Sequence, residues 1–171
     1  NTIISGYVLH GCGMDAFCKF QQMQAEGIMP DITTLLSILK MCSLTSALNI
    51  GMIIHSSMID SGLDIDEYAA SSLIDMYAKC NALTKAREVF DELPLRDVVV
   101  WSVLISGYAN HAYGEETLNC FNQMLHDGFS PDEVTLISIL KACGNLGASD
   151  KGKEVHANII KDGMLEEGTV I

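Results

Sequence analysis

The stretch that decides the fold is residues 98–132, which read VVVWSVLISGYANHAYGEETLNCFNQMLHDGFSPD. Apolar residues recur at the spacing of one helix face on both sides of a break near Gly114. They are Trp101, Leu104, Ile105, Tyr108, Leu118, Phe121 and Leu125. Gly128 then follows as a helix stop, and Pro131 prevents the helix from continuing. The stretch predicts a helix, a turn and a second helix.

The same pattern occurs earlier in the chain. Shifting the sequence by 101 residues aligns Ile4-Ser5-Gly6-Tyr7 with Ile105-Ser106-Gly107-Tyr108, and 24 of the 70 aligned pairs are identical. Self-similarity at this level indicates internal repeats.

The repeats divide the chain into units of similar length. The predicted units are 1–31, 32–66, 67–97, 98–132 and 133–167, with residues 168–171 beginning another, and they end at Asp31, Asp66, Asp97, Asp132 and Glu167. One hairpin cannot bury its apolar stripe alone, so neighbouring hairpins must stack. We therefore expect an all-α fold, a right-handed α-solenoid of stacked helix-turn-helix repeats, and a place within a longer protein.

Composition excludes several functional classes. The longest apolar run, Val98 to Ile105, falls short of the roughly 18 residues that a membrane helix needs. We find no nucleophile elbow, phosphate loop or zinc-deaminase motif, so we expect no catalysis, cofactor or small-molecule substrate. The net charge of -12 counts against a generic phosphate-binding surface, unless the cations gather on one concave face.

Cysteine and histidine, which are common metal ligands, recur together in two units. Cys42 with His55, and Cys143 with His156, offer thiolate and imidazole ligands. The two pairs occupy equivalent places in separate units, so we expect each histidine to pack within its own hairpin and no metal to bind.

The repeats resemble the plant PLS type of pentatricopeptide repeat protein, in which standard, long and short motifs alternate. Standard motifs are carried by Asn1 to Tyr7 with Phe20, Met23, Gly27, Pro30 and Asp31, and again between Val98 and Asp132. Long motifs show Leu39-Lys40-Met41-Cys42 with Gly51 and His55, and Leu140-Lys141-Ala142-Cys143 with Gly152 and His156. The short motif contains Ser72 to Cys80 and Ala86 to Asp91. At the helix junction, Asn110, His111 and Tyr113 depart from the usual glycine-rich pattern.

The resemblance implies binding of single-stranded RNA, about one base per hairpin, through the fifth and last residues of each motif. The implied pairs are Asn1 with Asp31, Ser71 with Asp97, and Ser102 with Asp132. By the family's pattern the first pair favours uridine and the two serine pairs favour guanosine. Leu36 with Asp66 and Ile137 with Glu167 imply little discrimination, so the implied site is U-N-G-G-N.

The second motif position sandwiches the base in this family. Val99 occupies it here, as do Tyr68 and Val134, whereas Thr33 offers a poorer surface for stacking.

Two alternatives stay open for these residues. The aspartates can simply cap the following helices, and the serines can bond back to a carbonyl one turn earlier. The whole array can also be a scaffold for a basic protein partner. For RNA binding, Lys40, Lys79 and Lys141 should face the groove.

The family also implies a cellular setting. Its members serve organellar RNA processing such as cytidine-to-uridine editing, with the deaminase in a separate domain or partner protein. We therefore expect a mitochondrial or chloroplast protein that works with editing or processing partners, whose targeting peptide lies outside this sequence.

Overall fold

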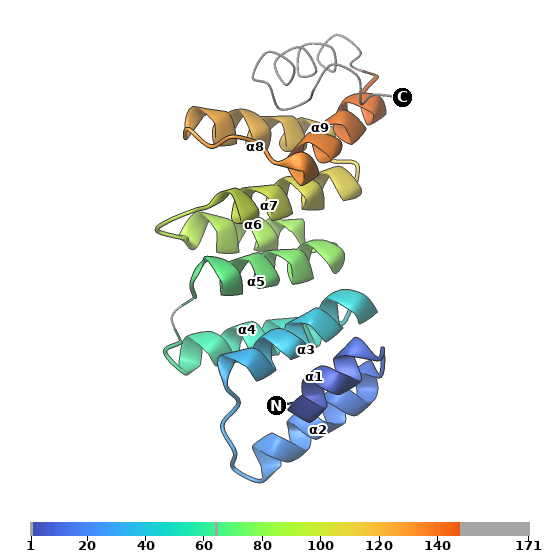
Figure 1. Ribbon diagram of the computed structural model, residues 1–171, viewed down its shortest axis with the longest axis vertical. Helices are drawn as coiled ribbons and strands as arrows, with labels where there is room; N and C mark the ends of the chain where they lie inside the picture. The colour runs from blue at the N-terminus through green and yellow to red at the C-terminus, as the bar shows by residue number, and fades with distance from the viewer. Residues whose placement is uncertain (1, 64, 148–171) are drawn as a thin grey trace.

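The computed structural model describes residues 2–63 and 65–147, and within these ranges every regular element is an α-helix (Figure 1). The helices are α1 (Thr2–Leu9), α2 (Gly13–Ala25), α3 (Ile32–Thr45), α4 (Leu48–Asp60), α5 (Glu67–Lys79), α6 (Leu83–Glu92), α7 (Val98–Asn110), α8 (Gly114–His126) and α9 (Glu133–Asn145). This confirms the predicted all-α array of stacked hairpins.

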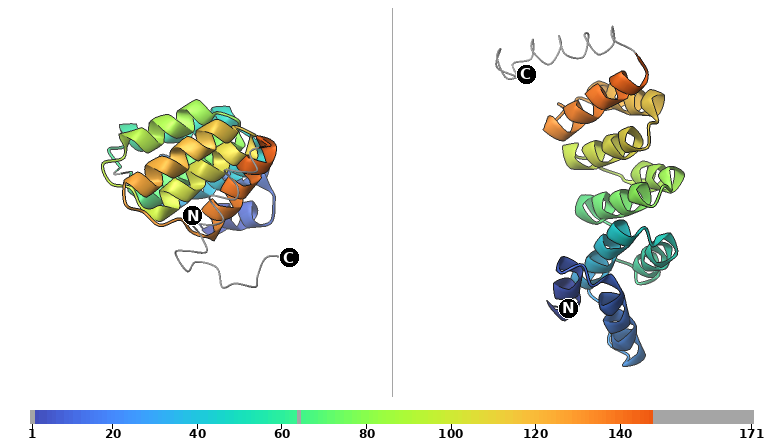
Figure 2. Two further views of the ribbon diagram at one scale, coloured as in Figure 1. Left: turned by 90° about the horizontal axis from the view of Figure 1, so that it is seen from above. Right: turned by 90° about the vertical axis from the view of Figure 1, so that its right-hand side faces the viewer.

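The helices form two layers, seen side by side in the right-hand view of Figure 2. The odd-numbered helices pack directly against each other, α1 on α3, α3 on α5, α5 on α7 and α7 on α9. The backbone of each even-numbered helix from α2 to α8 packs against the odd-numbered helices before and after it, and Arg87 on α6 also donates to Cys120 and Gln123 on α8. Because the helices of the odd-numbered layer lie closer together, this layer forms the inner, concave side of the stack.

Local sequence fixes where the inner helices begin. Asp31, Asp66, Asp97 and Asp132 are the N-caps of α3, α5, α7 and α9, which start at the first residues of the predicted units. Gly27 and Gly128 follow α2 and α8 with φ of 72° and 86°, a left-handed conformation that favours glycine. The stop signals in the sequence therefore act where they were expected.

The core lies between the two layers. Trp101 is fully buried in α7, and its ring meets the edge of Phe90 from α6 with centroids 4.5 Å apart. Between α5 and α7 the backbones approach closely, because a Cβ added at Gly107 would lie 2.9 Å from the Cβ of Ala78. Small residues thus set the spacing of the inner layer.

The predicted packing of His55 within its own hairpin is wrong. Its Nδ1 lies 2.9 Å from the Tyr77 hydroxyl on α5, in the following predicted unit, and the two rings meet edge to face. A half-buried imidazole needs a polar partner, and the next hairpin supplies it. His156 lies outside the described residues.

The unusual junction between α7 and α8 also links units. Ala112 takes the left-handed conformation that glycine usually adopts, with φ of 61°. The Nε2 of His111 lies 2.7 Å from the Ala78 carbonyl oxygen, so the histidine ties this turn to the preceding hairpin.

The described residues contain neither a membrane-spanning helix nor a cluster of metal ligands. None of the helices in residues 2–63 and 65–147 is both long and apolar enough to cross a membrane. Within the same ranges, no group of three or more His, Cys, Asp or Glu side chains is placed to hold a metal ion.

Candidate nucleic-acid interface

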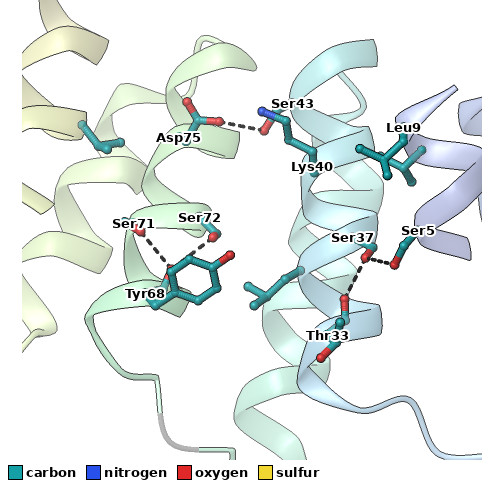
Figure 3. A pocket seen from close by; sticks show the side chains of 13 residues that line it. Ser5, Leu9, Thr33, Ser37, Lys40, Ser43, Tyr68, Ser71, Ser72 and Asp75 are labelled. Atoms are coloured by element: carbon teal, nitrogen blue, oxygen red, sulfur yellow. Dashed lines mark hydrogen bonds between the residues drawn. The ribbon is translucent and has the colours of Figure 1, made fainter. Parts of the chain in front are cut away.

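A hollow of about 610 Å³ lies on the inner layer across α1, α3, α5 and α7 (Figure 3). Its lining includes Thr33, Leu36, Tyr68 and Ser71, which occupy second and fifth motif positions, together with Lys40. The structure therefore brings together side chains that the motif pattern singles out in two neighbouring units.

The second-position side chains are exposed on this layer. Tyr68, Val99 and Val134 are 70%, 54% and 52% exposed, and Thr33 is exposed as well. These exposed side chains, one on each of α3, α5, α7 and α9, form a row, and its apolar members can accept the flat faces of bases. The Tyr68 ring offers the largest of them (Figure 3).

The unit-ending aspartates all cap helices. Carboxylate oxygens of Asp31, Asp66, Asp97 and Asp132 each accept a hydrogen bond of 2.8 Å from the backbone N–H three residues later. Capping uses one oxygen, so the capping role and a base contact through the other oxygen are compatible.

The fifth-position serines are almost buried. Ser71 is 9% exposed and donates to the Tyr68 carbonyl at 2.9 Å, while Ser102 is 4% exposed and lies 2.7 Å from the Val98 carbonyl. Both therefore make the backbone bond that serine commonly makes in helices. Only a small part of each hydroxyl can meet a ligand.

Ser102 and Asp132, the predicted pair of unit 98–132, are bonded to each other and also linked through a third residue. The Thr135 hydroxyl lies 2.8 Å from the Ser102 hydroxyl and donates to Asp132 Oδ1 at 2.8 Å. Burial raises the pKa of Asp132, but the hydrogen bonds from Thr135 and Ser102 outweigh it and lower that pKa overall. Asp132 is thus an anion held in place by neighbouring hydroxyls.

The aspartates of the other two predicted pairs, Asp97 and Asp31, have different hydrogen-bond partners from each other. Within the described residues no hydrogen bond joins Ser71 to Asp97, because Val100 stands where Thr135 stands in the next unit. Asp31 resembles Asp132, since the hydroxyl of Thr34 donates to it at 2.8 Å and lowers its pKa. Asn1 and Glu167 lie outside the described residues.

Charge is divided between the layers. Helices α1, α3, α5, α7 and α9 carry three lysines and three carboxylates, whereas α2, α4, α6 and α8 carry three cations and seven carboxylates. The excess acid of the described helices therefore lies on the outer layer. The inner helices are neutral, although the four cap aspartates add negative charge at their ends.

The three lysines proposed to face the groove lie on inner helices. Lys40 lines the hollow, Lys79 forms an ion pair of 2.8 Å with Asp75, and Lys141 donates to Asn110 on α7 at 2.8 Å. Lys79 and Lys141 thus already have partners, a feature that the motif pattern did not predict.

Comparison with known families identifies the repeats. The model of the PPR repeat family matches residues 96–145, and the PPR repeat model matches residues 1–28 and 68–98, together more than half of the chain. The chain belongs to the pentatricopeptide repeat family.

Among its relatives, a mitochondrial pentatricopeptide repeat-containing protein of Arabidopsis thaliana is 40% identical over 157 residues, 92% of this chain and 22% of the relative. A chloroplastic one from the same plant is 35% identical over 170 residues, 99% of this chain and 32% of the relative. The chain thus spans between a fifth and a third of the length of these two proteins.

A solved structure shares the fold. The pentatricopeptide repeat protein PPR10, known from maize, was crystallised with an 18-nt psaJ RNA element. That complex matches 96% of this chain and 25% of PPR10 with a TM-score of 0.79 and 25% identity.

The caps of these pentatricopeptide repeats can be tested separately from base contact. Replacing Asp66 by alanine removes the 2.8 Å bond to Ala69 N–H at the start of α5, so we expect a loss of about 1 kcal/mol in the free energy of unfolding. Urea denaturation measures it. Asp66→Ser keeps a capping oxygen and should recover most of the stability. Equal stability of all three proteins would show that the cap contributes nothing.

Proposed function

We propose that these pentatricopeptide repeats bind single-stranded RNA in a sequence-specific manner along the inner layer. The observation that carries the proposal is the inner-layer hollow, where exposed Tyr68 adjoins Ser71 and Lys40. An aromatic face, a small hydroxyl and a cation supply stacking, hydrogen bonding and phosphate attraction, the three interactions that single-stranded RNA needs. The likeness to RNA-bound PPR10 supports the same reading.

The proposed register follows the predicted units. Asn1 with Asp31, Ser71 with Asp97, and Ser102 with Asp132 read U, G and G, and Val99 helps to sandwich the base of its unit. Units 32–66 and 133–167 discriminate little. The starts of α3, α5, α7 and α9 support these unit boundaries and the alternation of standard, long and short motifs typical of the plant PLS subclass.

The proposed setting is an organelle. The two relatives described above are mitochondrial and chloroplastic proteins, which supports either location. We propose that the repeats supply binding and no catalysis, and that they position a processing activity such as cytidine-to-uridine editing, held in another domain or partner, on a transcript.

The test is binding of the full-length protein to labelled RNA containing U-N-G-G-N, compared at fixed salt with RNA in which both G positions are A. We expect the G-containing RNA to bind more tightly. Replacing Asp97 and Asp132 together by alanine should lower this preference about tenfold, because two charged acceptors for base N–H groups are lost.

Asp66→Ala is the matched control, since it removes an equivalent cap from a unit that carries Leu36 at the fifth position. It should leave the preference for G unchanged. Equal binding of both RNAs, or no binding, would contradict the proposal and favour a protein-binding scaffold whose acidic outer layer meets a basic partner.

A further inference from the structure

The hydroxyl groups of Ser102 and Thr135, which lie beside Asp132, make more hydrogen-bond contacts than they have protons to donate. Ser102 lies within hydrogen-bond distance of the Val98 carbonyl and of the Thr135 hydroxyl, and Thr135 reaches Asp132 Oδ1. The Ser102 hydroxyl also bonds to the Asp132 carboxylate. Two hydroxyls therefore have two protons for four contacts. Because the carboxylate is the strongest acceptor, the Thr135 proton points to Asp132. The Ser102 proton is then shared among the Asp132 carboxylate, the Thr135 oxygen and the Val98 carbonyl.

This arrangement fixes what the site offers to a ligand. The Ser102 proton has three acceptors inside the protein, so its oxygen offers lone pairs to a ligand, and Asp132 presents a carboxylate oxygen. Two adjacent acceptors match guanine, whose Watson–Crick edge carries the neighbouring donors N1–H and N2–H₂. Adenine and cytosine instead place an unprotonated ring nitrogen beside one donor group, and uracil has a single donor between two carbonyls.

We infer that Thr135 is a positioning residue for base selection, which makes the Ser102–Asp132 pair more selective for guanine than the Ser71–Asp97 pair. The inference rests on the proposed function. Thr135 is 0% exposed and cannot touch RNA itself, so it acts through Ser102 and Asp132.

The preceding unit is the natural comparison. The Ser71 proton has one acceptor in the described structure, the Tyr68 carbonyl, and the buried Val100 stands where a threonine would be needed. Ser71 can turn its proton toward an acceptor on adenine at the cost of a single neutral hydrogen bond. Its pair should therefore reject adenine less strongly.

The experiment measures the affinity ratio of G to A separately at the third and fourth positions of U-N-G-G-N, with the full-length protein at fixed salt. Thr135→Val keeps the shape and the backbone cap of Asp132 but removes the hydroxyl. We expect the G-to-A ratio at the fourth position to fall about fivefold, the value of one hydrogen bond, and the ratio at the third position to stay constant. Thr135→Ser should retain the ratio of the unsubstituted protein.

The reciprocal variant Val100→Thr provides an independent test, because it adds the hydroxyl beside Asp97. It should raise the G-to-A ratio at the third position. An unchanged fourth-position ratio in Thr135→Val, or an equal fall at both positions, would overturn the inference. So would an unchanged third-position ratio in Val100→Thr. If the unsubstituted protein shows no preference for G, the proposed function itself fails, a result distinct from either of these.

Discussion

Replacing Trp101 by alanine is expected to lower the free energy of unfolding by about 4 kcal/mol, the typical cost of removing a fully buried large aromatic side chain. The indole lies in α7, is 0% exposed and packs edge to face on Phe90. The Arg96 guanidinium lies over the Phe90 ring, with its carbon 4.6 Å from the centroid of that ring. Removal of the indole leaves a cavity where α6 and α7 meet.

Urea denaturation of the full-length protein measures this change. Trp101→Phe is the matched control, because the indole N–H has no hydrogen-bond partner among the described residues and a smaller ring therefore leaves no acceptor unpaired. It should cost clearly less than the alanine variant, because the smaller ring leaves a smaller cavity. A loss under 1 kcal/mol in the alanine variant would show that the core relaxes around the gap or that Trp101 is not central to it.

The helices could be predicted from the sequence because their signals are local. Apolar spacing gives each helix face, and Asp97, Gly128 and Pro131 mark where helices begin and end. Repetition of these signals at 101 residues made stacking the only way to bury the apolar stripes. Local signals thus carried most of the fold.

Contacts between units could not be predicted in this way. The bonds from His55 to Tyr77 and from His111 to the Ala78 carbonyl join hairpins, and their partners depend on how one hairpin rests on the next. The same holds for the near burial of Ser102 and for its link to Thr135. Motif positions identify candidate reading residues, whereas only packing shows which protons those residues can offer.

The acidic composition illustrates the same limit. A total charge of -12 says nothing about where the carboxylates lie. In the described helices the excess falls on the outer layer, away from Lys40 and the hollow. Salt screens the interaction between exposed charges over about 10 Å at moderate ionic strength. Carboxylates on the outer layer therefore repel an RNA on the inner layer less than the net charge alone suggests.

Replacing Gly107 by valine is expected to destabilise the array by about 3 kcal/mol through overpacking. A Cβ at this position would lie 2.9 Å from the Cβ of Ala78, a methyl group fixed to the backbone of α5 that has no rotamer by which to move away. Valine adds two further methyl groups in the same place. The two helices must then separate.

The matched control is Gly107→Ala, which adds the same Cβ without the two further methyl groups and gains about 1 kcal/mol in helix propensity, so it should lose clearly less stability than the valine variant. Urea denaturation separates the two variants. Because α5 carries Ser71 and α7 carries Ser102, separation should also weaken binding to U-N-G-G-N by altering the spacing of the two predicted guanine-reading sites. Equal stability of the valine and alanine variants would mean that α5 and α7 are not held at this spacing, and that the distance between adjacent reading sites is not set by Gly107.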